Sequence, residues 1–237
     1  MQETSDRQPP RLAAGITREV LETDGLRRVL RQRHPEVELI TDRVMRQSIA
    51  ATLDQAPPQA RAVEGVWVFG YGSLLWNPCV PVAEWRGGRI YGHHRDFHIR
   101  LTHGRGSPEA PGLMLGLVPG GSCPGMGLRI AARDLKHELL MIWRREMLTG
   151  VYRPRWVWLH TDDGCVPAIT FVVNTCSRSY CGRLAPDEMV HLLATGHGMI
   201  GSSAEYLANT VAQLDAQGIH DRHLKYLQAR VAASRGG

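Results

Sequence analysis

The chain has 237 residues, of which 43% are hydrophobic and 22% are charged, a composition that allows a buried core in one large domain or two small ones. No apolar run reaches the roughly 18 residues of a membrane span. The first residues, MQETSDRQPPR, lack the apolar stretch of a secretion signal, so we expect a cytoplasmic protein without membrane insertion. The net charge of +5 comes from scattered basic residues, which argues against a nucleic-acid surface and is compatible with a small anionic substrate.

Residues 1–64 are expected to form an N-terminal extension, separate from a larger domain over residues 65–237. Residues 1–15 are polar and contain prolines, which is typical of disorder. Helices are predicted over about 17–33 and 42–55, the second with Thr41 as its N-cap. The segment QAPPQARAVEG (55–65) is predicted to be a linker, because its two prolines cannot continue a helix.

After residue 65 the sequence changes to short apolar runs separated by glycine and proline. Six runs are typical of strands: residues 66–69, 97–101, 112–118, 126–130, 155–159 and 168–173. One helix is predicted between the fourth and fifth runs, and two more end the chain. Ser202 and Glu205 form a capping box for the first of these two, which runs to about Gly218, and Asp221 or its neighbours open the second. The pattern predicts an α+β domain whose sheet is strongly curved or closed.

The first strand-like run ends in an unusual loop, within VFGYGSLLWNP (68–78). A dinucleotide-binding fingerprint is excluded because Leu75 stands where the third glycine is needed and Asn77 and Pro78 prevent a long helix. A hydrolase nucleophile turn around Ser73 is excluded because Tyr71 and Leu75 occupy its glycine positions. Two interpretations are left: a backbone nest whose N–H groups point at one oxygen of a ligand, or a tight turn without a ligand.

The predicted helix at about 133–148 carries a carboxylate on its apolar face. At 100° per residue Glu146 falls in the middle of the apolar stripe, while Arg144 and Arg145 fall on the solvent side. Gly150 is expected to end the helix, which places Glu146 in or near its last turn. Burial and the negative end of the helix dipole would both raise the pKa of Glu146 toward neutrality, as a general base requires. The alternative is a buried structural glutamate bonded to an amide, an arginine or a tyrosine.

The cysteines and histidines are not expected to bind a metal. No C-x-x-C motif is present, so the cysteines are expected to be free thiols, and Cys176 and Cys181 could form only half of a metal site. Four histidines cluster in YGHHRDFHIRLTHGRG, at positions 93, 94, 98 and 103. His94 and His98 would share a face in a helix, but the glycines and the alternation of FHIRL indicate a strand. We therefore expect exposed or hydrogen-bonded histidines.

Four segments, in this order and spacing, resemble one known family. They are VFGYGSLLWNP (68–78), RDFHIRLTHGRGSPEAPGLMLGL (95–117), LLMIWRREMLTGVY (139–152) and GSSAEYLANTV (201–211). The resemblance is to the ChaC family of glutathione-specific γ-glutamylcyclotransferases and covers about residues 64–230. It implies a small mixed β-barrel flanked by helices, cleavage of glutathione to 5-oxoproline and Cys-Gly, and no cofactor.

Carried over by position, the resemblance implies that Glu146 is the catalytic acid/base and that Tyr71, Gly72, Ser73 and Leu74 form the γ-glutamyl-binding loop. A second acidic residue of some family members falls nine positions before Glu146. Here that position is His137, and the adjacent Glu138 is a weak substitute.

Further polar residues could belong to the same site. Tyr152 and Tyr206 are candidate wall residues, with ordinary core packing as the alternative. Arg95 and Arg100 could bind a carboxylate of glutathione or lie at the surface.

Three functions are compatible with these residues. The first is a lyase acting on glutathione, and the second is a non-catalytic γ-glutamyl sensor or regulator, in line with the family's older description as a cation-transport regulator. The third is the same chemistry on another γ-glutamyl peptide or amine. A buried base at Glu146 favours an enzyme, because binding a zwitterion does not require one. The sequence carries no signal for the oligomeric state.

Overall fold

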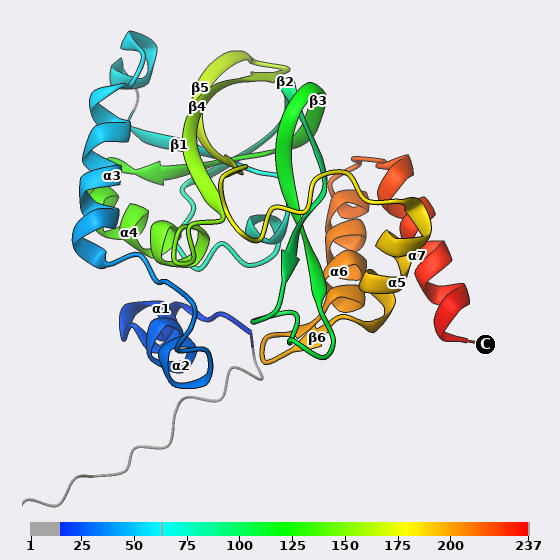
Figure 1. The fold of residues 1–237 in the computed structure, drawn as a ribbon. Helices are drawn as coiled ribbons and strands as arrows, with labels where there is room; N and C mark the ends of the chain where they lie inside the picture. The colour runs from blue at the N-terminus through cyan, green and yellow to red at the C-terminus, as the bar shows by residue number, and fades with distance from the viewer. Residues whose placement is uncertain (1–14, 63, 237) are drawn as a thin grey trace, which may run out of the picture.

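The computed structural model describes residues 15–62 and 64–236. Five strands of this part of the chain close into a barrel in the order β1-β3-β2-β4-β5, with helices packed around it (Figure 1). The strands are β1 (Gly65–Gly70), β2 (Glu84–Leu101), β3 (Gly112–Ala131), β4 (Tyr152–Thr161) and β5 (Gly164–Val173). The predicted α+β class and closed sheet are confirmed.

The long hairpin of β2 and β3 forms much of the barrel wall. The predicted runs 112–118 and 126–130 are two parts of the single strand β3, which pairs with β2 along nearly its whole length. Strand β2 begins at Glu84, well before the predicted run 97–101, because its glycines interrupt the apolar alternation. One of them, Gly88, allows β2 to approach β4: a Cβ there would lie 2.5 Å from the carbonyl oxygen of His160. Glycine at this position therefore permits closure of the barrel.

Seven helices form within the described residues: α1 (Arg18–Glu22), α2 (Gly25–Arg33), α3 (Asp42–Asp54), α4 (Leu135–Glu146), α5 (Pro186–Thr195), α6 (Ser203–Ala216) and α7 (Arg222–Arg235). The predicted helix over 17–33 divides at Asp24, whose left-handed φ of 54° separates α1 from α2. The side chains of Thr41, Ser202 and Asp221 each accept a hydrogen bond from the amide three residues later, as predicted for N-caps. Helix α5 was not predicted. No helix in the described range has the length and apolar composition to cross a membrane.

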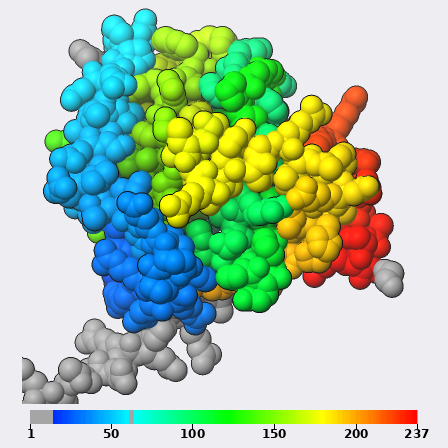
Figure 2. Space-filling view, in the orientation of Figure 1, coloured from blue at the N-terminus to red at the C-terminus, as the bar shows by residue number. Residues whose placement is uncertain are grey.

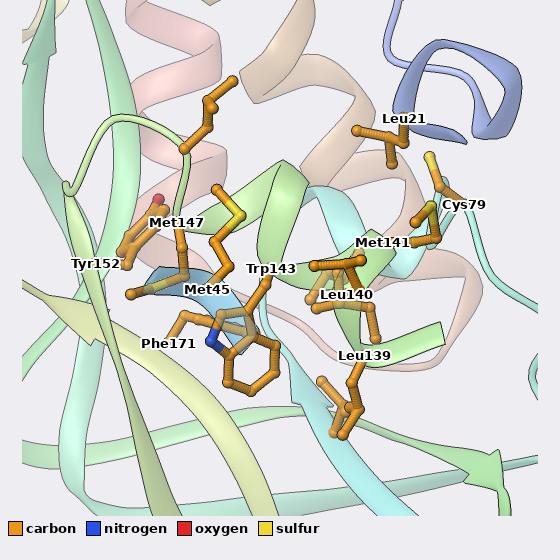
Figure 3. Packing of buried hydrophobic residues seen from close by; sticks show 14 of the residues in the cluster. Leu21, Met45, Cys79, Leu139, Leu140, Met141, Trp143, Met147, Tyr152 and Phe171 are labelled. Atoms are coloured by element: carbon orange, nitrogen blue, oxygen red, sulfur yellow. The ribbon is translucent and has the colours of Figure 1, made fainter. Parts of the chain in front are cut away.

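Two hydrophobic clusters lie on opposite sides of the barrel. One joins the barrel to α5, α6 and α7, which stand together on one side in Figure 1. The other joins it to α4 and to the N-terminal helices. Figure 3 shows part of this second cluster, in which Leu21 of α1 and Met45 of α3 belong with Leu140 and Trp143 of α4. Helix α4 is therefore buried between the barrel and the N-terminal helices.

The N-terminal segment, defined here as residues 16–54, thus shares a hydrophobic core with the rest of the chain. The division into an extension over 1–64 and a domain over 65–237 stays a prediction. The disorder predicted for residues 1–15 falls, apart from Gly15, outside the described residues. The predicted linker contains a short 3₁₀ helix at Pro58–Ala62.

Candidate active site

Glu146 is the last residue of α4. The amide of Met147 closes the helix by donating to the carbonyl oxygen of Trp143, at 2.8 Å, and Gly150 turns the chain away with a φ of 68°. The preceding turns bury Leu139, Ile142 and other apolar residues, so the helical period directs Glu146 inward, as predicted. Its side chain is 13% exposed and lines a cavity of about 400 Å³.

Two neighbouring effects on the charge of Glu146 oppose each other. Burial raises the pKa of the carboxyl group above its ordinary value, because the ionised form loses its hydration. The guanidinium of Arg145, whose Nε lies 3.0 Å from Oε1 of Glu146, lowers the pKa by a smaller amount. The net shift is upward, so this carboxyl group binds a proton at a higher pH than an exposed glutamate does.

The prediction that Arg144 and Arg145 face solvent is wrong. The side chain of Arg145 is 5% exposed and also donates to the carbonyl oxygen of Asn77. Arg144 pairs with Asp42 and donates to the carbonyl oxygen of Leu21, at 2.6 Å. The physical reason is that the N-terminal segment covers Arg144 and the loop after β1 covers Arg145, whereas a helical projection treats both positions as free.

Four of the predicted site residues line the same cavity: Glu146, Ser73, Tyr152 and Tyr206. The loop that contains Ser73 enters the cavity just after β1 and continues into a short 3₁₀ helix, Ser73–Leu75. A Cβ at Gly72 would lie 2.9 Å from the hydroxyl oxygen of Tyr206, so a side chain at this position would collide with the cavity wall. Glycine thus lets the loop backbone approach the cavity closely.

The side chains of Tyr71 and Leu74 are buried and are not among the residues that line the cavity. The hydroxyl of Tyr71 donates to the carbonyl oxygen of Phe171, at 2.8 Å, and Leu74 packs in the hydrophobic cluster of α4. Their side chains anchor the loop at both ends. We therefore expect these two residues to contact a ligand only through their backbone groups.

Three tyrosines surround Glu146. Burial raises the pKa of Tyr71, Tyr152 and Tyr206, and the charge of Glu146 raises each of them further. The phenols are therefore neutral hydrogen-bond donors. The hydroxyl of Tyr152 donates to the carbonyl oxygen of Leu115, at 2.6 Å, which fixes it at the cavity wall.

A half-buried arginine that was not predicted, Arg105, also lines the cavity. Its guanidinium lies 5.2 Å from the ring centroid of Tyr206, and Nη1 donates to the carbonyl oxygen of Ser202, at 3.4 Å. Burial lowers its pKa from the ordinary value, but a guanidinium remains a cation. Glu205 stands near it at the cavity edge, so the cavity contains a second carboxylate besides Glu146.

The two arginines named as carboxylate partners lie elsewhere. Arg95 is buried and bonds to Asp221, at 2.8 Å, and to the carbonyl oxygen of Tyr71, at 3.0 Å. Arg95 therefore stabilises the backbone of the loop at Tyr71. Arg100 pairs with Glu188 near the surface. Sequence patterns alone did not separate these two from Arg105, although Arg105 stands out by the glycines on either side of it.

The candidates for a second family carboxylate lie outside the cavity. Both carboxylate oxygens of Glu138 bind Arg18 of α1, at 2.7 and 2.9 Å. His137 is exposed, and its Nε2 lies 4.0 Å from Glu22. Helix α4 thus presents one carboxylate to the cavity and uses the other to hold the N-terminal segment.

The histidine cluster separates into two places. His103 is buried at the cavity, with its ring 6.0 Å from that of His34. His94 and His98 share one face of β2 with Asp96, and their ligand-type atoms lie within 4.8 Å of one another. The expectation that only a helix would bring His94 and His98 to one face is therefore wrong, because alternate residues of a strand also share a face.

The Asp96 carboxylate has protein partners. It accepts a hydrogen bond from the amide of Phe97, at 2.7 Å, and pairs with His223 of α7, at 3.1 Å. This cluster thus connects β2 to α7. The absence of a bound metal stays a prediction.

Comparison with known proteins places the chain in a family. A protein-family profile described as ChaC-like protein matches residues 66–234. The chain belongs to the ChaC-like family. Among the relatives of this ChaC-like protein is the glutathione-specific γ-glutamylcyclotransferase of Escherichia coli K12, which is 39% identical over 185 residues, 78% of each chain. The human glutathione-specific γ-glutamylcyclotransferase 1 is 26% identical over 68% of this chain and 76% of its own.

A solved structure shows the same fold. The crystal structure of the γ-glutamylcyclotransferase specific to glutathione from yeast superposes on the ChaC-like protein with a TM-score of 0.67 and 21% sequence identity. The match covers 73% of this chain and 98% of the yeast chain. The barrel and its surrounding helices are therefore shared with that structure.

Proposed function

We propose that this ChaC-like protein is a γ-glutamylcyclotransferase specific for glutathione, a lyase that releases 5-oxoproline and cysteinylglycine in the cytoplasm without a cofactor. The observation that carries the proposal is the carboxyl group of Glu146, which has a raised pKa and lies in a cavity beside Ser73, Tyr152 and Tyr206. The name of the E. coli relative supports glutathione as the substrate. Neither a nucleic acid nor a membrane takes part in this chemistry.

The reaction needs a base and an acid but no nucleophile from the protein. The α-ammonium group of the substrate, with a pKa of about 8, loses a proton to Glu146, and the free amine attacks the δ-carbonyl carbon of its own side chain. A five-membered ring closes, and the C–N bond to cysteinylglycine breaks as the leaving nitrogen is protonated. Two protons pass in all from the attacking to the leaving nitrogen, and Glu146 can carry each of them.

The raised pKa suits Glu146 to both steps. An ordinary glutamate, with a pKa of about 4.3, is several units too weak to take a proton from an ammonium group. Burial narrows this difference, and Arg145 keeps enough ionised carboxylate to act as a base. Holding the substrate curled inside the cavity supplies much of the remaining rate advantage.

The other cavity residues bind and polarise the substrate in this proposal. The loop at Gly72 and Ser73 would hold the γ-glutamyl group, with Tyr206 as a neutral donor near the oxygen that develops negative charge. Arg105 offers a half-buried cation for one of the two carboxylates of glutathione. Tyr71, Leu74 and Arg95 would act through the position of the loop.

The test is an assay of 5-oxoproline release from glutathione, γ-glutamyl-alanine and γ-glutamyl-ε-lysine. We expect glutathione to be cleaved best and Glu146→Gln to lose about 100-fold or more in kcat with an unchanged circular dichroism spectrum. Glu138→Gln is the matched control, since it changes a buried carboxyl group of the same helix outside the cavity.

The outcomes separate the three functions. Full activity of Glu146→Gln would contradict the mechanism. Release of 5-oxoproline only from the other two compounds would assign the enzyme a different substrate. Binding of glutathione without any release would support a sensor.

A further inference from the structure

We propose that the N-terminal segment is part of the substrate-binding site, where Ile16, just before α1, and helix α2 form an apolar wall that selects the leaving half of a γ-glutamyl substrate. The identity of the substrate rests on the proposed function. The profile match of the family begins at residue 66, so this wall comes from sequence outside the matched region.

The wall consists of three aliphatic side chains. Ile16, Leu26 and Leu30 line the same cavity as Glu146. Leu26 and Leu30 are nearly buried and belong to the hydrophobic cluster around α4, and Ile16 packs against it. The segment therefore contributes apolar surface to the cavity through side chains that the core holds in place.

The polar groups of the cavity come from other elements. Ser73 and Asn77 belong to the loop after β1, Arg105 to the segment between β2 and β3, and Glu146 to α4. The γ-glutamyl half of a substrate carries an ammonium and a carboxylate, so it requires these polar groups. The aliphatic wall is thus left to the other half of the substrate.

This division of the cavity has a chemical consequence for selectivity. The cysteinyl side chain of glutathione is small and uncharged and can lie against aliphatic carbon at no electrostatic cost. The free ε-ammonium of γ-glutamyl-α-lysine, in which the γ-glutamyl group acylates the α-amino group of lysine, would lose hydration against the same carbon without gaining a partner there. The wall therefore favours an uncharged side chain next to the scissile bond.

Hydrogen bonds fix the wall to the substrate loop. The side-chain amide of Asn77 donates to the carbonyl oxygen of Ile16, at 2.7 Å, and the thiol of Cys79 donates to the same oxygen, at 3.1 Å. Asn77 itself lines the cavity. Ile16 is thus held from the loop that follows Ser73, and the two sides of the cavity are directly bonded.

Further contacts fix the wall to the helix that carries Glu146. Arg18 binds Glu138 through two hydrogen bonds, and Arg144 donates to the carbonyl oxygen of Leu21, at 2.6 Å. The amide of Ile40 donates to the carbonyl oxygen of Leu148, at 2.9 Å. In the space-filling view the blue N-terminal helices lie directly against the green part of the chain (Figure 2).

The experiment compares two cavity variants, Ile16→Ala and Leu30→Ala, with Leu21→Ala. Leu21 is a buried leucine of the same segment that is not among the cavity-lining residues. Leu21→Ala therefore removes as much packed side chain as Leu30→Ala does, without changing the cavity wall. We expect both cavity variants to raise KM for glutathione several-fold and to lower the ratio of kcat/KM for glutathione over γ-glutamyl-α-lysine by about 10-fold. Leu21→Ala should lower the melting temperature as Leu30→Ala does and leave the ratio unchanged.

An unchanged ratio in both cavity variants, or an equal change in Leu21→Ala, would overturn the proposal. Calorimetric titration of glutathione into full-length proteins that also carry Glu146→Gln tests the wall independently of turnover. Weaker binding in Ile16→Ala but not in Leu21→Ala supports the wall even if no 5-oxoproline is released, in which case only the proposed function fails. Equal affinity for glutathione in all variants overturns the proposal that the N-terminal segment binds the substrate.

Discussion

At the scale of single residues, the environment of Glu146 is a balance between desolvation and one cation. Burial disfavours the ionised carboxyl group, and Arg145 at 3.0 Å partly restores it. A group whose folded-state pKa exceeds its unfolded value binds more protons in the folded state, so it lowers stability as the pH rises above the unfolded pKa. The raised pKa of Glu146 should therefore reduce the stability of the fold at neutral pH.

This gives a signed prediction for Glu146→Gln. The difference in melting temperature, variant minus wild type, should increase as the pH rises from about 4.5 through the raised pKa of Glu146. One proton limits the effect to about 1.4 kcal/mol per pH unit. Thermal unfolding of both proteins between pH 4 and pH 8 measures the difference. A difference that is constant with pH would show that Glu146 has the same pKa in the folded and unfolded chains.

At the scale of helices, α4 joins the N-terminal segment to the barrel. Its apolar face packs into the hydrophobic cluster, and its polar residues bind α1 and α3 rather than water. Glu138 is 9% exposed as a side chain, while its partner Arg18 is 36% exposed. Loss of Arg18 would thus leave a mostly buried carboxylate without its counter-ion.

Arg18→Ala should loosen α1 more than it lowers global stability. We expect a cost of about 1–2 kcal/mol, less than for a fully buried pair because Arg18 is partly exposed. Hydrogen–deuterium exchange of residues 18–33 measures the local effect. Arg133→Ala is the control, since its pair with Asp134 is 90% exposed on the arginine side. Equal exchange in the two variants would contradict a role for Arg18 in holding α1.

At the scale of the whole molecule, barrel closure depends on positions where strands approach without side chains. Two adjacent glycines of β2 differ sharply in this respect. A Cβ at Gly88 would lie 2.5 Å from the carbonyl oxygen of His160, whereas a Cβ at Gly87 would meet only Sδ of Met126, at 3.8 Å. Contact between β2 and β4 therefore tolerates a methyl group at one position and not at the next.

Gly88→Ala should destabilise the protein by about 2 kcal/mol or more, while Gly87→Ala should be neutral or stabilise it by about 0.5 kcal/mol. Urea denaturation followed by tryptophan fluorescence gives both values. If the two variants unfold at the same urea concentration, β2 and β4 do not require close approach at Gly88.

The sequence predicted features that depend on local periodicity and missed those that depend on tertiary neighbours. The inward direction of Glu146 follows from the helical period, and the N-caps Thr41, Ser202 and Asp221 follow from local hydrogen bonding. The burial of Arg144 depends on a segment more than a hundred residues earlier in the chain. Arg105 and Ile16 were missed for the same reason, because a cavity wall is assembled from separate elements.

The pairing of β1 with β5 determines when, during synthesis, the cavity can form. Trp67 of β1 lies opposite Ala168 of β5, and Tyr206 of the cavity wall comes still later. A growing chain thus contains Ser73 and Glu146 before it contains the strand and helix that enclose them. Pairings between such distant residues form late. The cavity can therefore form only after the chain has been synthesised through Tyr206.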